Sequence, residues 1–292
     1  MIGDKTHLES LKQQYPEKFV SEKNIFKHIQ AGDRIFIGTA CGEPQYLSKA
    51  LIRYVESNPK ALLDAEVLHI WSLGVAPYTD TRFKRNFRQS AFFIGEYARE
   101  AINRGEGDYS PIFLSQVPRL IRRGMIPIDV ALIQTTPPDQ HGFMSLGVSV
   151  DIIKAAVAKA SLVIAQINNR MPRVHGDTFL HINDISFIIP HNEPLLEYET
   201  TVPSDVAERI GKYVASIVED GDTIQVGYGS TPNAIIAALS NKHNLGVHTE
   251  LFSHGIADLM KQGVVNNTKK RIDHSKTVAA FCMGNKETYE FI

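Results

Sequence analysis

The sequence contains one internal repeat, and this repeat restricts the possible folds more than any other feature. Each copy reads as a turn, a short apolar strand, a glycine-bearing loop and a helix, and each follows a helical stretch. The matching positions are Gly32 and Gly221, Gly38 and Gly227, Pro44 and Pro232, and Leu51 and Leu239. Gly-Asp turns before strands are common, so chance is the alternative explanation. The agreement across several consecutive elements favours a duplicated domain.

The rest of the chain fits an α/β fold. Short buried strands are expected at residues 65–73, 129–135, 161–167 and 185–190, and helical patterns at 46–56, 118–123 and 149–159. This alternation is typical of a largely parallel sheet flanked by helices. We therefore predict two similar domains of this kind, an N-terminal domain at residues 1–200 and the first part of a C-terminal domain at 201–292, joined through a polar, extended stretch at 193–204.

The second domain is expected to be incomplete. The two copies of the repeat lie 189 residues apart, from Gly38 to Gly227, so a second domain as long as the first would extend beyond residue 292. The chain stops soon after a strand-like stretch at 278–283, and we predict no closing helix there. An apolar face should then stay exposed near residues 278–281.

Composition excludes several classes of protein. With 31 basic and 32 acidic residues among 292, the formal charge of -1 gives no electrostatic reason to expect a nucleic acid or a membrane surface as partner. We see no apolar signal-peptide core and no apolar run of about 18 residues that would span a bilayer. The two cysteines, Cys41 and Cys282, argue against a disulfide framework and fit the cytoplasm.

Two elements in the second half could carry chemistry. Ligands of open α/β sheets bind at the carboxyl ends of strands. The loop of Gly227, Tyr228, Gly229, Ser230 and Thr231 follows one predicted strand, and Glu250 ends the next. Glycines and a helix N-terminus suit an anion or oxyanion, and a carboxylate beside them is a candidate nucleophile. The alternatives are a tight strand-to-helix turn and a solvated or helix-capping carboxylate.

Longer motifs resemble a known family. The stretches Gly227–Ala234, Leu245–Glu250, Pro137–Ser149 and Asn168–Gly176 are similar to motifs of the acetyl-CoA hydrolase/transferase family, particularly transferases for acetate, butyrate or 4-hydroxybutyrate. The resemblance implies that Glu250 forms a glutamyl-CoA thioester and that residues Gly227 to Thr231 bind CoA. It implies that acyl-CoA and a short-chain carboxylate are the substrates, with coenzyme A as a substrate rather than a permanently bound cofactor. It also implies that no metal is needed and that the protein forms a homo-oligomer. Family members continue past this end with a glycine-rich region that also contacts CoA.

Alternatives exist for the function and for other residues. An acyl-CoA hydrolase would use the same glutamate. A non-catalytic ligand-binding fragment would neither transfer nor hydrolyse an acyl-CoA. Cys41 reads as a small buried residue rather than a thiol nucleophile. Asp139 and His141 read as turn residues rather than an acid–base pair. Arg170 and Arg173 fit either a substrate carboxylate or a solvated loop. The segment 269–271 reads as a solvated basic turn that could also meet CoA phosphates.

Overall fold

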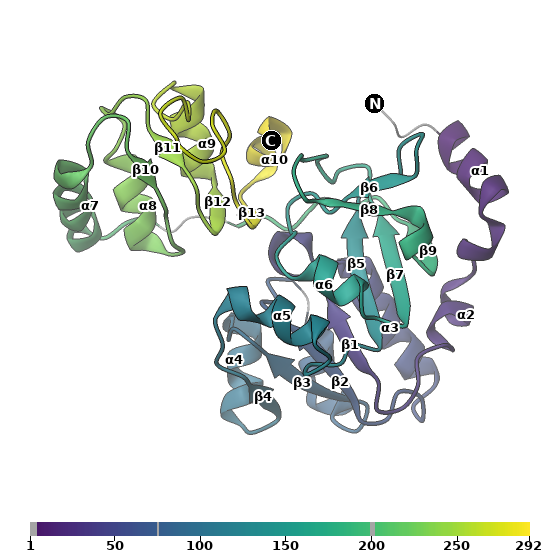
Figure 1. The fold of residues 1–292 in the computed structure, drawn as a ribbon. Coiled ribbons are helices and arrows are strands. Elements are labelled where there is room, and N and C mark those ends of the chain that lie inside the picture. Colours follow the sequence, from purple (N-terminus) through teal and green to yellow (C-terminus); the bar gives the residue numbers. More distant parts are fainter. Residues whose placement is uncertain (1–4, 75, 199–201) are drawn as a thin grey trace. The chain divides into compact units, whose positions relative to one another are not determined.

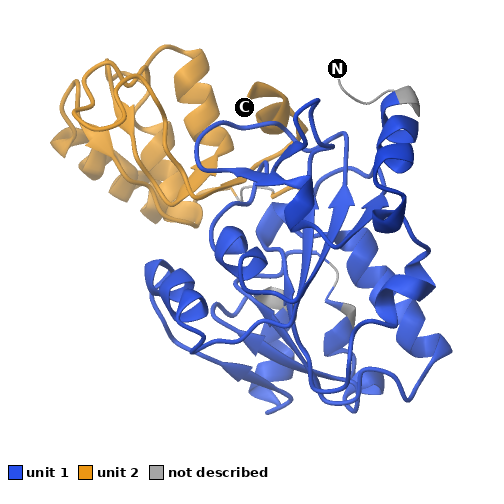
Figure 2. Cartoon of the chain, turned by 45° about the vertical axis from the view of Figure 1, so that its right-hand side comes forward, with its two compact units in different colours: residues 1–196 blue, residues 197–292 orange. Residues whose placement is uncertain are grey.

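The computed structural model describes residues 5–74, 76–198 and 202–292. The chain divides into two compact units, Met1–Leu196 and Glu197–Ile292 (Figure 2). The predicted domain boundary, between residues 200 and 201, lies outside the described residues. Within the described part, no helix is long and apolar enough to cross a membrane.

The first unit is built on a seven-stranded parallel sheet with the strand order β4-β3-β2-β1-β5-β7-β9 (Figure 1). Its strands are β1 (Arg34–Ile37), β2 (Ala65–His69), β3 (Phe87–Ala91), β4 (Gly107–Tyr109), β5 (Val130–Thr135), β7 (Leu162–Ile167) and β9 (Phe187–Pro190). A separate antiparallel pair joins β6 (Phe143–Ser145) to β8 (Phe179–His181). The α-helices are α1 (Lys5–Gln14), α2 (Glu22–Phe26), α3 (Gln45–Ser57), α4 (Glu96–Asn103), α5 (Val117–Arg122) and α6 (Ile153–Val157). The 3₁₀ helices are η1 (Pro16–Lys18), η2 (Ala40–Gly42), η3 (Pro77–Thr79), η4 (Thr81–Phe83), η5 (Leu114–Gln116) and η6 (Ile182–Asp184).

Helices cover both faces of this sheet, so its central strands are apolar on both sides. All six residues of β5 are buried. Ala131 and Ile133 belong to a core cluster with residues of α5 and α6, while Val130 and Leu132 belong to a cluster with residues of α2 and α3. Side chains of a strand alternate between its faces, which explains why a continuous apolar run forms a central strand here.

The strand order reverses between β1 and β5, where an open sheet usually binds its ligand. Here the chain itself fills that position. The hydroxyl of Ser149 donates to the carbonyl of Thr39 at 2.9 Å, and the amide of Gln134 donates to the carbonyl of Glu43 at 3.1 Å. A Cβ placed on Gly42 would lie 2.4 Å from the Cβ of Ser149. The loop after β1 is therefore closed by neighbouring side chains.

One carboxyl group of the first unit is enclosed beside this loop. Glu43 is 1% exposed, and its Oε2 accepts hydrogen bonds from the Ser72 hydroxyl at 2.9 Å and the Gly74 N–H at 3.1 Å. No described residue forms a hydrogen bond with its Oε1. Burial raises the pKa of Glu43 from 4.5 to about 7, although the hydrogen bonds from Gly74 and Ser72 lower it in part.

The second unit begins with the same order of elements as the first repeat. Its elements are α7 (Asp205–Ile217), β10 (Thr223–Ile224), α8 (Ser230–Ala237), β11 (Gly246–Val247), β12 (Leu251–Ser253), α9 (His254–Lys261), β13 (Phe281–Met283) and α10 (Lys286–Phe291). β10 pairs with β11 in parallel, as β1 pairs with β2, and β12 pairs in parallel with β13. The helix–strand–helix–strand order of α2, β1, α3 and β2 thus recurs in α7, β10, α8 and β11.

Helix α7 has two different apolar faces. Ser204 caps it by accepting a hydrogen bond from the N–H of Ala207. Its small residues face α8 so closely that a Cβ on Gly211 would lie 2.7 Å from the carbonyl oxygen of Ala234. Its larger apolar residues are exposed: Val206, Ile210, Tyr213 and Ile217. The exposed apolar surface lies here rather than at residues 278–281, which are half-buried.

Several boundaries differ from the sequence-based predictions. A closing helix, α10, follows β13 where none was predicted, and Asn285 caps it by accepting from the N–H of Thr288. β2 ends at His69 rather than at residue 73. β3 and β4 were not predicted, because both are polar and β4 is short.

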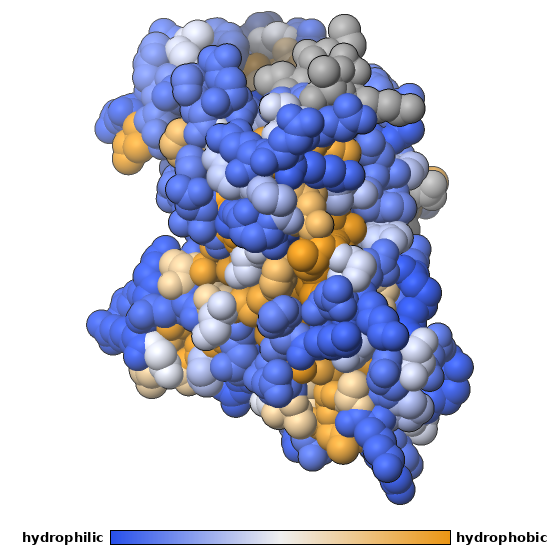
Figure 3. All heavy atoms as spheres, turned by 90° about the vertical axis from the view of Figure 1, so that its right-hand side faces the viewer, coloured by the Kyte–Doolittle hydropathy of each residue, from blue (hydrophilic) through white to orange (hydrophobic). Residues whose placement is uncertain are grey.

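In the space-filling view, hydrophilic side chains dominate the visible face and apolar ones form a band near its middle (Figure 3).

The raised pKa of Glu43 makes a stability prediction. Folding binds a proton at Glu43 between pH 4.5 and 7, so this contribution to stability is complete below pH 4.5 and is lost as the pH rises through 7. The free energy of unfolding should fall by about 3 kcal/mol at most from this group. Urea unfolding at pH 5 and pH 8 measures the fall, with Glu43→Gln as the variant that cannot titrate. An equal fall in both proteins would contradict the prediction.

Candidate active site

The glycine-bearing loop of the second unit lies at the carboxyl end of a parallel strand pair. β10 and β11 are in register at Thr223 with Gly246 and at Ile224 with Val247, so both strands end at one edge. The loop of residues 227–229 follows β10 and leads into α8 at Ser230. Gly229 has φ +125, a conformation that side chains rarely adopt. The first turn of α8 therefore presents backbone N–H groups at this edge.

This loop is open, in contrast to its counterpart in the first repeat. Gly227, Tyr228 and Ser230 are exposed, whereas residues 38–44 of the first repeat are all buried. A Cβ on Gly227 or Gly229 would meet nothing nearer than Pro232, at 3.9 and 3.8 Å. Cys41 lies in the closed loop and is fully buried, which favours its interpretation as a small core residue. Of the two loops, the second is accessible to a ligand.

Tyr228 is held by an aromatic neighbour from the start of the second unit. Its ring centroid lies 5.2 Å from that of Tyr198, with the two ring planes tilted by 50°. The N–H of Tyr198 donates to the carbonyl of Gly284 at 2.9 Å, which ties that segment to the turn after β13. Tyr228 is still 46% exposed, so its ring provides an apolar surface beside the loop.

Glu250 lies between β11 and β12, at the same edge as the loop. Its carbonyl oxygen accepts hydrogen bonds from the N–H groups of Ala280, at 2.9 Å, and Phe281, at 3.2 Å, so its backbone is fixed. Its side chain is exposed, and no described residue forms an ion pair or a hydrogen bond with the carboxylate. A carboxylate without a competing partner is available as a nucleophile, and it is equally what a solvated surface glutamate would look like.

Thr249 connects the carboxylate to the loop. Its buried hydroxyl accepts a hydrogen bond from the Val226 N–H at 3.1 Å and donates one to the Val226 carbonyl at 2.8 Å. Val226 immediately precedes Gly227, and Thr249 immediately precedes Glu250. The structure thus brings together the two elements that the sequence singled out. The sequence reasoning did not assign a role to Thr249.

Two side chains hold the other edge of β11. The Val247 N–H donates to the Asn267 side-chain oxygen at 2.9 Å, and the Lys270 ammonium donates to the Val247 carbonyl at 2.9 Å and to the Lys276 carbonyl at 2.6 Å. Burial lowers the pKa of Lys270, and the charge of Asp273 raises it in part. The interpretation of residues 269–271 as a solvated turn is wrong for Lys270, although Lys269 and Arg271 are exposed.

The residues of the first unit that the sequence singled out form a turn. The carboxylate of Asp139 accepts hydrogen bonds from the N–H groups of His141 and Phe143, each at 2.9 Å, and forms an ion pair with Arg173. Burial raises the pKa of Asp139, but these bonds and the Arg173 charge outweigh it, and the net pKa is lowered. This supports turn chemistry at Asp139 and His141. Arg170 is exposed.

The histidines of the second unit contact carboxylates or hydroxyls. His248 lies 3.9 Å from Asp273, and His254 lies 3.0 Å from the Thr288 hydroxyl and 3.3 Å from Asp258. In the part of the chain that the structure describes, no three His, Cys, Asp or Glu residues gather where a metal ion could bind. The sequence did not indicate two buried polar atoms in this unit, the Asn233 amide nitrogen and the Ser253 hydroxyl, which form no hydrogen bond with any described residue.

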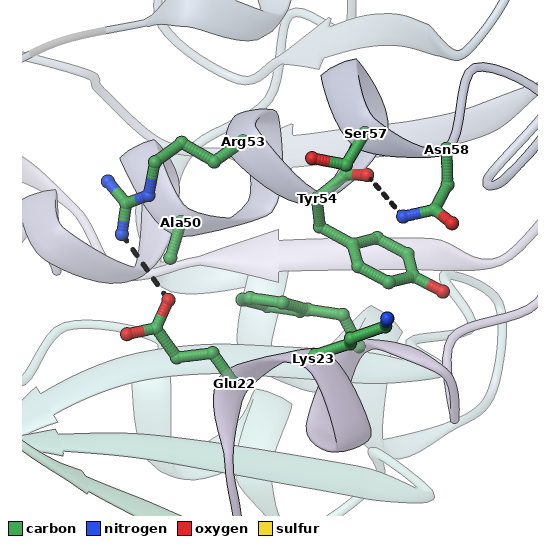
Figure 4. Close-up of a pocket in the computed structure, with 8 residues that line it drawn as sticks. Glu22, Lys23, Ala50, Arg53, Tyr54, Ser57 and Asn58 are labelled. Carbon is green, nitrogen blue, oxygen red and sulfur yellow. Dashed lines mark hydrogen bonds and ion pairs between the residues drawn. The ribbon is translucent and has the colours of Figure 1, made fainter.

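A cavity of about 270 Å³ lies elsewhere, between α2 and α3 of the first unit. Figure 4 shows the Arg53 guanidinium directed at Glu22 and the Asn58 amide at the Tyr54 carbonyl. Glu22 also accepts a hydrogen bond from the Tyr46 hydroxyl. Glu22 and Arg53 are therefore paired with one another, and the cavity lies against helices rather than at the ends of strands.

Known proteins are similar to this chain in sequence and in structure. The family model described as "Acetyl-CoA hydrolase/transferase N-terminal domain" matches residues 4–197. The 4-hydroxybutyrate coenzyme A transferase of Clostridium kluyveri is 41% identical over 278 residues, which are 95% of this chain and 64% of that protein. The structure is similar to that of RipA from Yersinia pestis, with a TM-score of 0.88 and 29% identity over 96% of this chain and 67% of RipA. It is also similar to the 4-hydroxybutyrate CoA-transferase of Porphyromonas gingivalis, with a TM-score of 0.83 and 31% identity over 96% of this chain and 66% of that protein. The chain spans under two thirds of the Clostridium relative.

Lys270 gives a prediction for this site. Lys270→Met keeps most of the apolar length of the side chain but removes the ammonium. The Lys276 carbonyl then loses its Lys270 donor, the Val247 carbonyl keeps the Val278 N–H at 3.3 Å, and the free energy of unfolding should fall by about 1–3 kcal/mol. The matched control, Lys269→Met, changes an exposed neighbour and should stay within about 0.5 kcal/mol of the unchanged protein. Urea unfolding monitored by circular dichroism compares the three proteins. Equal stability of the two variants would show that Lys270 does not hold β11.

Proposed function

Because this chain belongs to the acetyl-CoA hydrolase/transferase family, we propose that it carries the nucleophile of a CoA-transferase, Glu250, and a CoA-binding loop at residues 227–231. The observation that carries the proposal is the link from Thr249 to Val226, which joins an exposed carboxylate to an open loop at a helix N-terminus. The substrates would be an acyl-CoA and a short-chain carboxylate, in line with the names of the curated relatives.

The reaction needs a carboxylate that attacks a thioester. The Glu250 carboxylate would attack the carbonyl of the acyl-CoA and form a mixed anhydride, and CoA thiolate would leave. The thiolate would then attack the glutamyl carbonyl, giving a glutamyl-CoA thioester and the free carboxylate of the first acid. The acceptor carboxylate would repeat the two steps in reverse and leave with CoA, so that Glu250 returns unchanged. No redox partner is needed in any step.

The loop would stabilise the charge that develops on the way. Each tetrahedral intermediate places negative charge on a carbonyl oxygen, and backbone N–H groups are suitable donors for it. The N–H groups of residues 227–230 lie at the start of α8, where the helix dipole also favours negative charge. The loss of one such donor typically slows a reaction by about 10²–10³-fold.

Two alternatives use the same residues. In an acyl-CoA hydrolase, water would take the place of the acceptor carboxylate, and the exposure of Glu250 is compatible with this. In a ligand-binding protein, the loop would hold CoA and Glu250 would react with nothing. Transfer that depends on added acceptor acid separates the first alternative from a transferase, and any covalent modification of Glu250 excludes the second.

Substitution of Glu250 in the full-length protein tests the proposal. Glu250→Gln should reduce transfer nearly to background while CoA binding is largely kept, because the amide has the same shape but is a far poorer nucleophile. Glu250→Asp keeps the carboxylate but withdraws it by one methylene, so it should lose about 10²-fold and still exceed the Gln variant. Initial rates of acyl-CoA exchange and titration with CoA measure the two effects.

The sample for this test must be fresh, because deamidation of the introduced glutamine would restore the glutamate. Near-normal transfer by a Glu250→Gln sample whose mass excludes deamidation would rule out Glu250 as the nucleophile. The buried position of Cys41 makes it a poor replacement, and thiol alkylation would test it.

A further inference from the structure

We propose that Thr249 is a positioning residue for the transfer reaction, which orients the Gly227 N–H and the Glu250 carboxylate together through one hydroxyl. The proposal rests on the proposed function of Glu250 and the loop. Thr249 is 6% exposed, so its hydroxyl is shielded from water and its two hydrogen bonds are not in competition with solvent.

The Thr249 hydroxyl continues the link between the two segments beyond the last backbone hydrogen bond of the β10–β11 pair. The last backbone bond from β11 to the β10 side joins the His248 N–H to the Ile224 carbonyl at 3.1 Å. Val226 lies two residues after Ile224, and both the N–H and the carbonyl of Val226 form hydrogen bonds with the Thr249 hydroxyl. The Thr249 backbone N–H meanwhile donates to the Val278 carbonyl at 2.9 Å. Thr249 therefore joins its own segment to two others, one through its side chain and one through its backbone.

The hydrogen bond to the Val226 carbonyl also controls the next amide. That carbonyl and the Gly227 N–H belong to one planar, trans peptide unit, in which the N–H points away from the C=O. A hydroxyl that fixes the carbonyl direction thus fixes the opposite direction for the Gly227 N–H. Gly227 has no side chain that could hold this peptide in place, and no other atom lies close to its Cβ position except Pro232.

Thr249 also fixes the backbone position from which the Glu250 side chain extends. Glu250 is the next residue in the chain, and its own carbonyl is bound by Ala280 and Phe281. A shift of Thr249 would therefore move the carboxylate and the Gly227 N–H relative to each other. Misplacement of reacting groups by about 1 Å can cost roughly 10²-fold in rate. A single hydroxyl can do this because it both donates and accepts, which valine at this position cannot.

The test uses three substitutions in the full-length protein. Thr249→Val keeps the shape and removes both hydrogen bonds, and it should lower kcat by about 10- to 10²-fold while KM for acyl-CoA changes far less. Thr249→Ser keeps the hydroxyl and should recover most of kcat. Thr223→Val is the matched control, because it removes an exposed hydroxyl from β10 without touching Val226. Melting temperatures of all variants separate positioning from folding.

Thr249→Ala covers the case in which the valine variant does not fold, because the smaller side chain leaves room for water at Val226. A folded Val or Ala variant with the kcat of Thr249→Ser would overturn the positioning role. So would a fall in kcat that Ser does not recover. If Glu250→Gln were also fully active, the proposed function would have failed instead, so the two failures are distinguishable.

Discussion

Both units are organised by parallel pairing of short strands. Parallel pairing places the carboxyl ends of neighbouring strands at one edge, and this alone brings residues far apart in sequence together there. In the second unit the pairing of β10 with β11 brings the loop after Ile224 beside the segment that ends at Glu250. In the first unit the same geometry brings Glu43, Gln134 and Ser149 together at the ends of β1 and β5.

The two copies of the repeat use this edge differently. In the first, Ser149 closes the loop after β1, and the nearby Glu43 is buried with a raised pKa. In the second, the loop is exposed and the carboxylate of Glu250 has no described partner. A closed edge stabilises the fold, whereas an open one leaves backbone donors for a ligand. This difference explains why the proposed chemistry belongs to the second copy.

The sequence predicted the elements whose signal is local. Strands β5 and β7 are largely apolar runs, and α3 has clear helical periodicity, so their positions were predicted closely. The strands β3 and β4 were not. β3 is mostly buried but carries the polar residues Arg88, Gln89 and Ser90, and β4, at the sheet edge, is short and has no buried residue. The loop and Glu250 were proposed as site residues from glycines and a family motif, and the structure places them at one edge. Thr249 and Asn267 were missed, and Lys270 was interpreted as a solvated residue, since the importance of all three lies in hydrogen bonds to distant backbone that no sequence spacing indicates.

We propose that Glu250 becomes covalently bound to CoA during turnover. Incubation of the full-length protein with acyl-CoA, followed by borohydride, would reduce a glutamyl thioester to the alcohol, and peptide mass spectrometry locates the change. We expect a loss of one oxygen and a gain of two hydrogens at Glu250, which depends on acyl-CoA and is absent from Glu250→Gln. An unmodified Glu250 in a protein that transfers CoA and whose other carboxylates are modified instead would contradict it.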